Sequence, residues 1–392
     1  MALKTGLFFV VSILLSFAVN AADSNCQQHQ CIAVVDAGST GSRLHIYAYD
    51  LDKTNTAINI KEFWTKKIKP GLATIEANQA TLDAYLTTLF ADAPGENIPV
   101  YFYATAGMRL LSQPKQQQFY VLMKKWFANQ FKWKLRCAKT INGIDEGLFG
   151  WLTVNYELGT LNTEDKPSIG VMDMGGASVQ IMFPVEKMDG IKNNDVRQLD
   201  LYGRHLTLFI HSFLGLGQTE VSHQFLDFPP CFSDNYELPT GFPAFGDAYS
   251  CEIVVSSLMN NVHHVNTIIQ PVIAANPVNN WFVMGGMAEL AKSQPFQFDN
   301  YQFTNQTLLE QADTQICHQQ WSILNQQYPN NEYLYGYCLF SSYYYALMVD
   351  GYGMPPQQPV NYMTANQSSD WTLGVVLHQQ PVNLKIEILP WK

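Results

Sequence analysis

The feature that most constrains the fold of this chain is a short segment that occurs twice. Residues 32–46 read IAVVDAGSTGSRLHI, and residues 169–181 read IGVMDMGGASVQI. In each copy an apolar, β-prone run ends at an aspartate, and a glycine follows two residues later. Small or hydroxyl-bearing residues then lead into a second β-prone run. The pattern predicts two hairpins, each with two strands joined by a tight loop.

The two loops have the chemistry of polyphosphate-binding loops. Glycine lets backbone N–H groups converge on an anion because no Cβ atom stands in the way, and serine and threonine add hydroxyl donors. Asp36 and Asp173, at the ends of their strands, are placed to hold Mg²⁺ or Ca²⁺ through its water shell. Two unrelated glycine-containing hairpins are the alternative, which the match between the copies disfavours. No G-x-x-x-x-G-K sequence followed by Ser or Thr occurs, which excludes a P-loop NTPase.

Two segments between the hairpins carry further polar groups. Residues 103–111 read YATAGMRLL, and the hydroxyl of Thr105 with the guanidinium of Arg109 suits a third contact to phosphate. Residues 141–156 read INGIDEGLFGWLTVNY, in which Asp145 and Glu146 open an apolar helix. Acidic residues are favoured in the first turn of any helix, so this pair does not indicate catalysis by itself.

Composition excludes several classes of protein. The 392-residue chain is 47% hydrophobic and 14% charged, with a formal net charge of −10. Disorder, collagen and coiled coil are excluded, and the length suits about two domains. A net acidic chain without a long basic tract is a poor candidate for general nucleic-acid binding. The mixed basic and aromatic residues 124–136 are therefore predicted to be an amphipathic helix that runs into a strand.

The amino terminus has the layout of a secretory signal. Lys4 precedes an apolar run over residues 7–19, and small residues up to Ala21 suit cleavage. The run is shorter than the about 20 residues that span a bilayer. We expect a signal peptide over residues 1–21, no membrane span after its removal, and a secreted or periplasmic protein. An uncleaved anchor is the alternative.

All seven cysteines follow this signal, so export makes disulfides chemically possible. Pairing of neighbours along the chain would join Cys26 to Cys31, Cys231 to Cys251 and Cys317 to Cys338, with Cys137 left as a buried thiol. The sequence alone does not fix this connectivity. No C-x-x-C or H-E-x-x-H spacing occurs, so no zinc site is predicted.

Four segments taken together resemble the apyrase family, the nucleoside triphosphate diphosphohydrolases (NTPDases). They are, in order along the chain, DAGSTGSR, YATAGMRLL, DEGLFGWLTVNY and DMGGASVQ. Later segments extend the resemblance over about residues 30–375. It implies an α/β fold of two actin-like (RNase H-like) domains with the active site in the interdomain cleft. Domain I would comprise residues 22–142 plus 361–392, and domain II residues 143–360.

The resemblance also assigns roles to residues of this chain. Glu146 would deprotonate the attacking water, Ser178 and Gln180 would hold that water, and Asp36 and Asp173 would hold the cation through water. The implied phosphate-binding residues are Ser39, Thr40, Gly41, Ser42, Arg43, Thr105, Arg109, Gly175, Gly176 and Ala177. Arg43 and Arg109 are the candidate charge-assisted contacts, and a structural role for Arg109 inside its own domain stays open.

One region departs from the family pattern. Animal members have an aromatic-rich segment that stacks on the base, whereas residues 281–290 here read WFVMGGMAEL, without tyrosine. Glu289 falls near the stacking position, and Tyr333 falls in the other base-contacting stretch. We therefore expect a loose base preference, because stacking distinguishes bases poorly.

The predicted function is hydrolysis of the terminal phosphates of nucleoside tri- and diphosphates, with Mg²⁺ or Ca²⁺ as cofactor. We expect a secreted bacterial member of the family that is a monomer and does not bind nucleic acid. An exopolyphosphatase or guanosine pentaphosphate phosphatase is the first alternative, since such enzymes share paired phosphate loops. A catalytically inactive, nucleotide-binding adhesin is the second. An exported sugar kinase lacks a supply of ATP outside the cell.

Overall fold

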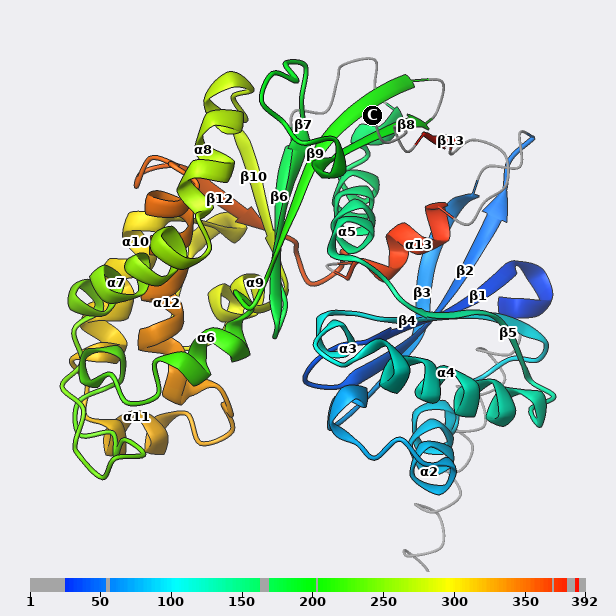
Figure 1. The fold of residues 1–392 in the computed structure, drawn as a ribbon, viewed down its shortest axis with the longest axis horizontal. Coiled ribbons are helices and arrows are strands. Elements are labelled where there is room, and N and C mark those ends of the chain that lie inside the picture. The colour runs from blue at the N-terminus through cyan, green and yellow to red at the C-terminus, as the bar shows by residue number, and fades with distance from the viewer. Residues whose placement is uncertain are drawn as a thin grey trace, which may run out of the picture. The chain divides into compact units, whose positions relative to one another are not determined.

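The structure is a computed structural model that describes residues 25–53, 57–162, 169–201, 204–368, 370–378 and 385–387. The expected signal peptide, residues 1–21, lies outside these ranges. The chain divides into two compact units (Figure 1). Unit 1 consists of Met1–Asn142 and Thr372–Leu384, and unit 2 of Gly143–Trp371 and Lys385–Lys392.

The first boundary between the units lies between Asn142 and Gly143. The second lies between Trp371 and Thr372. Residues Pro359–Tyr362 form strand β12, which pairs with strands of unit 2, and the chain joins unit 1 at Thr372.

Unit 1 is built on a five-stranded mixed sheet in the order β3-β2-β1-β4-β5. The strands are β1 (Gln30–Ala37), β2 (Ser42–Leu51), β3 (Ala57–Ile68), β4 (Ile98–Ala104) and β5 (Trp133–Thr140). Strands β1, β2 and β3 form an antiparallel meander, whereas β4 runs parallel to both β1 and β5. The glycine-rich first loop is the turn between β1 and β2.

Helices cover both faces of this sheet. The helices are α2 (Gln79–Phe90), α3 (Ala106–Arg109), α4 (Gln113–Ala128) and α13 (Thr372–His378). Alternate β1 residues, among them Ala33 and Val35, join the core beneath α2 and α4. On the other face the hydroxyls of Tyr47 and Thr372 are 2.7 Å apart, which ties α13 to β2. The predicted amphipathic helix running into a strand is confirmed as α4 followed by β5.

Unit 2 is built on an eight-stranded sheet in the order β11-β12-β10-β6-β7-β9-β8-β13. Its strands are β6 (Ile169–Met174), β7 (Ser178–Pro184), β8 (Val196–Leu201), β9 (Arg204–Leu214), β10 (Asn280–Met284), β11 (Gln302–Thr304), β12 (Pro359–Tyr362) and β13 (Lys385–Glu387). Strand β6 is antiparallel to β7 and parallel to β10. The second glycine-rich loop is the turn between β6 and β7.

One helix covers the face of this sheet that carries the candidate site. It is α5 (Gly143–Glu157), and it contacts β6, β7 and β9. Its approach is close, because a Cβ atom at Gly147 would lie 2.7 Å from Cγ2 of Ile210. The buried residues on the other face of the sheet join a core supplied by α6 (Gln218–Gln224), α7 (Ala248–Ser257), α8 (Val265–Ala275), α9 (Gly285–Lys292), α10 (Asn305–Ala312), α11 (Trp321–Gln327) and α12 (Tyr337–Ala346).

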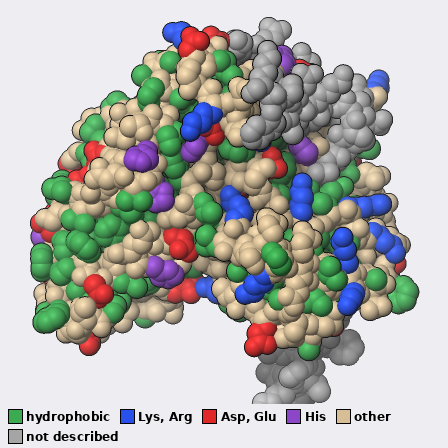
Figure 2. Space-filling view, viewed as in Figure 1, with side chains coloured by type: hydrophobic (Ala, Val, Ile, Leu, Met, Phe, Trp, Pro, Cys, Tyr) green, Lys and Arg blue, Asp and Glu red, His purple; other side chains and the backbone are tan. Residues whose placement is uncertain are grey.

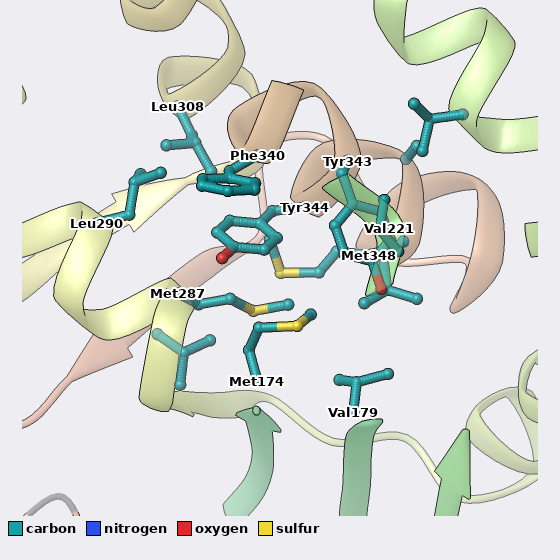
Figure 3. Packing of buried hydrophobic residues seen from close by; sticks show 14 of the residues in the cluster. Met174, Val179, Val221, Met287, Leu290, Leu308, Phe340, Tyr343, Tyr344 and Met348 are labelled. Carbon is teal, nitrogen blue, oxygen red and sulfur yellow. The ribbon is translucent and has the colours of Figure 1, made fainter. Parts of the chain in front are cut away.

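The core of unit 2 anchors the second loop from beneath. Met174 and Val179, on either side of the loop, point into a cluster that includes Met287, Tyr344 and Met348 (Figure 3). The tyrosine run 343–345 lies in α12, where Tyr343 and Tyr344 are fully buried.

Short turns complete both units. The 3₁₀ turns are Leu72–Thr74, Thr160–Asn162, Asn193–Asp195, Pro229–Cys231, Asp299–Tyr301 and Leu334–Gly336. Helices α7, α10 and α12 continue directly into the π-helical turns Leu258–Val262, Asp313–Cys317 and Leu347–Gly351. None of the helices in the described ranges combines the length and the apolarity needed to cross a bilayer.

The cysteines pair as neighbours along the chain. Disulfides join Cys26 to Cys31, Cys231 to Cys251 and Cys317 to Cys338, as predicted. Cys137 is free, but its side chain is half-buried instead of buried, because it lies on β5 at the edge of the sheet.

Candidate active site

The two predicted hairpins are present and have the same register. Asp36 on β1 pairs with Arg43 on β2, and Asp173 on β6 pairs with Gln180 on β7. Each aspartate is the next-to-last residue of its strand and is followed by the glycine-rich loop. The two aspartates thus occupy equivalent places in the two units, while the paired positions differ in chemistry: a guanidinium in unit 1 and an amide in unit 2.

The end of the unit 1 sheet carries a cationic row of side chains. In register across β2, β1 and β4, Arg43 faces Asp36, and Asp36 faces Tyr103. Lys67 pairs with Arg43 from β3, and Lys139 pairs with Tyr103 from β5. The Lys139 ammonium lies 5.5 Å from the centre of the Tyr103 ring. Three cations and one carboxylate share this row, which suits an anionic ligand.

The first loop is flanked by the segment that contains Thr105 and Arg109. The Thr105 N–H donates to the Ala37 carbonyl at 3.1 Å, and the Arg109 N–H donates to the Thr105 carbonyl at 3.2 Å. A Cβ atom at Gly107 would lie 2.8 Å from Cα of Ser39, so α3 packs against the loop. The structure therefore brings Ser39, Thr105 and the start of α3 together within unit 1.

Ser42 differs from its neighbours in the first loop. It is the first residue of β2, and its side chain is fully buried. Its hydroxyl accepts a hydrogen bond from the Tyr85 hydroxyl at 2.8 Å. Burial raises the pKa of Tyr85 to about 12, so this donor stays protonated. The structure places the Ser42 hydroxyl within the core of unit 1, whereas Ser39 and Thr40 lie on the loop itself.

The carbonyls of the second loop are held by the start of α6. The Gly175 carbonyl accepts from Gln218 N–H at 2.9 Å, and the Gly176 carbonyl accepts from Thr219 N–H at 2.8 Å. In a planar trans peptide the next N–H points opposite to the carbonyl. The N–H groups of Gly176 and Ala177 therefore point away from α6, which is the arrangement of a backbone anion site.

Five polar side chains of unit 2 meet on the face of the sheet covered by α5. Asp173, Gln180 and Ser212 lie in register on β6, β7 and β9. Glu146 approaches from the first turn of α5. The Gln180 amide nitrogen lies 3.3 Å from Oε2 of Glu146, 2.8 Å from Oγ of Ser178 and 3.1 Å from Oγ of Ser212. The structure thus brings Glu146, Ser178 and Gln180 into one hydrogen-bonded cluster.

The orientation of the Gln180 amide follows from its partners. An ionised carboxylate only accepts hydrogen bonds, so the amino end of the amide faces Glu146. Its carbonyl oxygen Oε1 is buried and has no hydrogen-bond partner among the described residues. A buried acceptor without a partner is unfavourable, and a bound water that donates to Oε1 and to Glu146 would satisfy both groups.

Asp173 lies among other carboxylates. Burial, together with the negative charges of Glu146 and Asp370, raises the pKa of Asp173 to about 8. A divalent cation nearby would lower this pKa again, and carboxylate oxygens are the ligands that Mg²⁺ and Ca²⁺ prefer. The donor set therefore fits a hard cation. Within the described ranges, no group of three or more His, Cys, Asp or Glu side chains is arranged to ligate a metal directly.

Sequence reasoning did not single out Ser212 or Asp370. Ser212 belongs to a segment, residues 211–215, that resembles the family, but its place beside Gln180 depends on the pairing of β7 with β9. Asp370 lies about 200 residues after Glu146 and Asp173 in the chain, outside the four segments that resemble the apyrase family. Only the folded unit brings its charge near Asp173.

The two candidate base-contacting residues are not joined by a direct contact. Glu289 is exposed on α9, and its carboxylate lies 3.8 Å from the Lys292 ammonium. Tyr333 is half-buried, and its N–H donates to the Asn331 side chain at 3.2 Å. Asn331 in turn donates to the Gln294 carbonyl just after α9. The two segments are therefore neighbours within unit 2.

Comparison with known proteins gives consistent results. The profile of the GDA1/CD39 (nucleoside phosphatase) family matches residues 22–227 and 243–389. The chain is 25% identical to Probable apyrase 5 of Arabidopsis thaliana, over 96% of this chain and 87% of the relative. It is 26% identical to Ectonucleoside triphosphate diphosphohydrolase 1 of Mus musculus, over 88% and 80% of the two chains.

Solved structures establish the fold. A nucleoside triphosphate hydrolase from Neospora caninum is 13% identical with a TM-score of 0.54, over 96% of this chain and 97% of the other. An exopolyphosphatase from Cytophaga hutchinsonii is 13% identical with the same TM-score of 0.54, over 90% and 100%. The predicted fold class, two α/β units of the actin-like type, is confirmed.

Proposed function

The chain belongs to the GDA1/CD39 (nucleoside phosphatase) family, and on that premise we propose that it removes the terminal phosphate from nucleoside triphosphates and then from the resulting diphosphates. It is a hydrolase that acts on nucleoside phosphates. The observation that best supports the finer proposal is the buried cluster of Glu146, Ser178 and Gln180 beside the second loop.

In the proposed reaction a water oxygen attacks the terminal phosphorus in line with the bond to the leaving group. The water would donate one hydrogen bond to Oε2 of Glu146 and one to the free Oε1 of Gln180. As the new P–O bond forms, a proton passes to Glu146, and the bridging P–O bond breaks to release the shorter nucleotide. A general base within hydrogen-bond reach of the water is what this chemistry requires.

The phosphate groups would be held by the two loops. In unit 2 the N–H groups of Gly176 and Ala177 point away from α6 and are available to phosphate oxygens. In unit 1 the loop residues Ser39, Thr40 and Gly41, together with Thr105 and the cationic row, would supply the matching contacts. The buried Ser42 hydroxyl would support the first loop through Tyr85.

A divalent cation would be held through water by Asp36 and Asp173. When bound it would neutralise charge on the phosphate oxygens and offset the repulsion between Asp173, Glu146 and Asp370. The proposed metal is Mg²⁺ or Ca²⁺.

A phosphate-release panel tests the proposal. We expect release from ATP, ADP, GTP and UTP at comparable rates with Mg²⁺ or Ca²⁺, and none with EDTA. Inorganic polyphosphate serves as the comparison substrate. Turnover of polyphosphate without turnover of nucleotides would replace the proposal by the exopolyphosphatase alternative, and activity in EDTA would contradict the role of the cation.

The role of Glu146 is tested by a neighbouring pair of variants. Glu146→Gln keeps the size of the side chain but removes the base, so we expect kcat to fall by at least ~10². Asp145→Asn makes the same chemical change one residue away, where the carboxylate lies 3.9 Å from Arg197, and we expect kcat to stay within a few-fold. Equal losses in both variants would contradict the assignment.

A further inference from the structure

The net charge of the chain conceals opposite charges on its two units. Residues 25–142, the main part of unit 1, contain 14 Lys and Arg against 8 Asp and Glu, a net charge of +6. Residues 143–371 of unit 2 contain 6 Lys and Arg against 23 Asp and Glu, a net charge of −17. Figure 2 shows Lys and Arg side chains gathered over the part of the surface that belongs to unit 1.

The positive charge is concentrated around α4 and β5. No Asp or Glu occurs between Glu96 and Asp145, and residues 113–140, which comprise α4, the turn after it and β5, contain seven Lys and Arg. The end of α4 and the beginning of β5 lie together at one end of unit 1, because the short turn Asn129–Lys132 joins them. Here the exposed cations are Lys124, Lys125, Lys132, Lys134 and Arg136.

Two apolar side chains are exposed among these lysines. Phe131 in the turn is 90% exposed, and Val121 on α4 is 54% exposed. The other aromatic residues of the same segment behave differently, since Trp126, Phe127 and Trp133 are 7%, 5% and 4% exposed. We call the set Val121, Lys124, Lys125, Phe131, Lys132, Lys134 and Arg136 the α4–β5 patch.

We propose that the α4–β5 patch is a docking surface for an anionic lipid membrane. The lysine ammonium groups would face anionic headgroups, and Phe131 would insert its ring at the boundary between headgroups and acyl chains. Clusters of four to eight basic residues bind such membranes, and each contributes about fivefold to the partition coefficient. Exposed aromatic residues add the apolar contribution.

The composition of the patch favours lipid over nucleic acid. Four of its five cations are lysines, which act as point charges on flexible apolar stems that reach along a lipid interface, and Arg136 is the one arginine. Nucleic-acid surfaces favour arginine, whose planar fork binds phosphate with two hydrogen bonds. An aliphatic side chain such as Val121 also gains nothing beside a base, whereas it gains from contact with acyl chains.

Vesicle sedimentation of the full chain tests the proposal. We expect binding to vesicles of phosphatidylcholine with about 30% phosphatidylserine, weaker binding to pure phosphatidylcholine, and loss of the difference at high salt. The triple variant Lys124→Gln, Lys125→Gln, Lys132→Gln should lower the partition coefficient by about 100-fold. Phe131→Ser should lower it by about tenfold, because it removes the buried ring.

Matched control variants test whether the loss of vesicle binding is specific to the α4–β5 patch or follows from the removal of any exposed lysines or any exposed aromatic ring. Lys53→Gln, Lys61→Gln, Lys67→Gln removes three exposed cations elsewhere in unit 1, and Phe242→Ser removes a side chain that is 69% exposed in unit 2. Both should bind vesicles more tightly than the corresponding patch variants. Thermal unfolding checks that every variant is folded.

Three outcomes would overturn the proposal. One is equal binding to anionic and neutral vesicles, and another is equal loss in the patch and control variants. The third is binding to heparin or an oligonucleotide, measured by fluorescence anisotropy, without binding to vesicles. The last outcome would assign the patch to a different polyanion.

Discussion

At the scale of single residues, the site depends on the side-chain amide of Gln180, which has several hydrogen-bond partners. Gln180 has two amide protons for three acceptors, on Glu146, Ser178 and Ser212. Ser212 lies directly across from Gln180 on the adjacent strand, so it acts on the water only through the amide. We regard Ser212 as a positioning residue.

This role makes Ser212 a useful test of the mechanism. Ser212→Ala removes one acceptor, so we expect kcat to fall by about fivefold with KM unchanged, the usual contribution of one hydrogen bond. Ser212→Thr retains the hydroxyl and should restore most of the rate. Thr207→Val on the same strand is the control. A rise in KM, or no rescue by threonine, would contradict a positioning role.

At the scale of elements, the start of α6 supports the second loop. Besides the hydrogen bonds to the loop carbonyls, Gly217 lies against the loop backbone. A Cβ atom there would lie 2.3 Å from the nitrogens of Ala177 and Ser178. The loop and the helix therefore form one rigid piece, and a side chain at Gly217 would push the loop away.

Gly217→Ala should consequently reduce both stability and activity. We expect a loss of about 1–3 kcal/mol, typical of overpacking, together with a lower kcat. Gly159→Ala is the control, because its φ of +69° is strained for alanine but no atom lies within 4 Å of the added Cβ. It should lose about 1 kcal/mol and keep full activity. Denaturant unfolding and phosphate release measure the two effects.

Another element-scale prediction concerns pH. Glu252 on α7 and Asp350 in the turn after α12 are hydrogen-bonded carboxyl groups. Burial, together with the hydrogen bond and the negative charge of Asp350, raises the pKa of Glu252 to about 8. The folded state therefore binds a proton that the unfolded chain releases above its ordinary pKa of 4.5. Stability from this group falls as pH rises from about 4.5 to about 8.

Thermal unfolding between pH 5 and pH 9 tests whether the stability contributed by Glu252 falls as the pH rises. Relative to the parent, Glu252→Gln should have a higher Tm at pH 8.5, a smaller difference at pH 5, and a flatter dependence of Tm on pH. The tyrosines beside the pair, Tyr249 and Tyr345, have pKa values that burial raises, so they stay neutral over this range. A constant difference in Tm across the range would contradict the prediction.

At the scale of the whole molecule, the hairpins and the helix at residue 143 could be predicted because their signals are local. Glycine, aspartate and alternating apolar residues identify the strand–loop–strand units. The end of unit 2 has no comparable local signal. Pro359 resembles a linker residue in the sequence, but it is the first residue of β12, a position where proline is tolerated.

The remaining parts of the site depend on contacts between distant residues. Ser212 reaches Gln180 through strand pairing, and Asp370 reaches Asp173 only through the fold of unit 2. The charge difference between the units could not be recognised from the overall composition for a related reason. The net charge of the chain averages over both units, so the opposite charges are found only when the residues of each unit are counted separately.

Helix α13 gives a prediction about cooperativity. Val375 is fully buried on this helix, and α13 packs against β1, β2 and β3 of unit 1. Val375→Asp should destabilise unit 1 by several kcal/mol, because it buries a charge without a partner. Hydrogen exchange should then lose protection in β1 and β2 first, while β6 and β7 stay protected. Val121→Asp, at an exposed position, is the control. Simultaneous loss in all four strands would indicate that the units unfold together.

The position of α13 in the chain also has a consequence for biosynthesis. The ribosome makes the sheet of unit 1 first, but the helix that covers one face of that sheet is made only after nearly all of unit 2. Unit 1 can therefore complete its fold only after nearly all of unit 2 has been synthesised. A nascent chain would emerge with an incomplete amino-terminal half, and chaperones would encounter that half before its second face is covered.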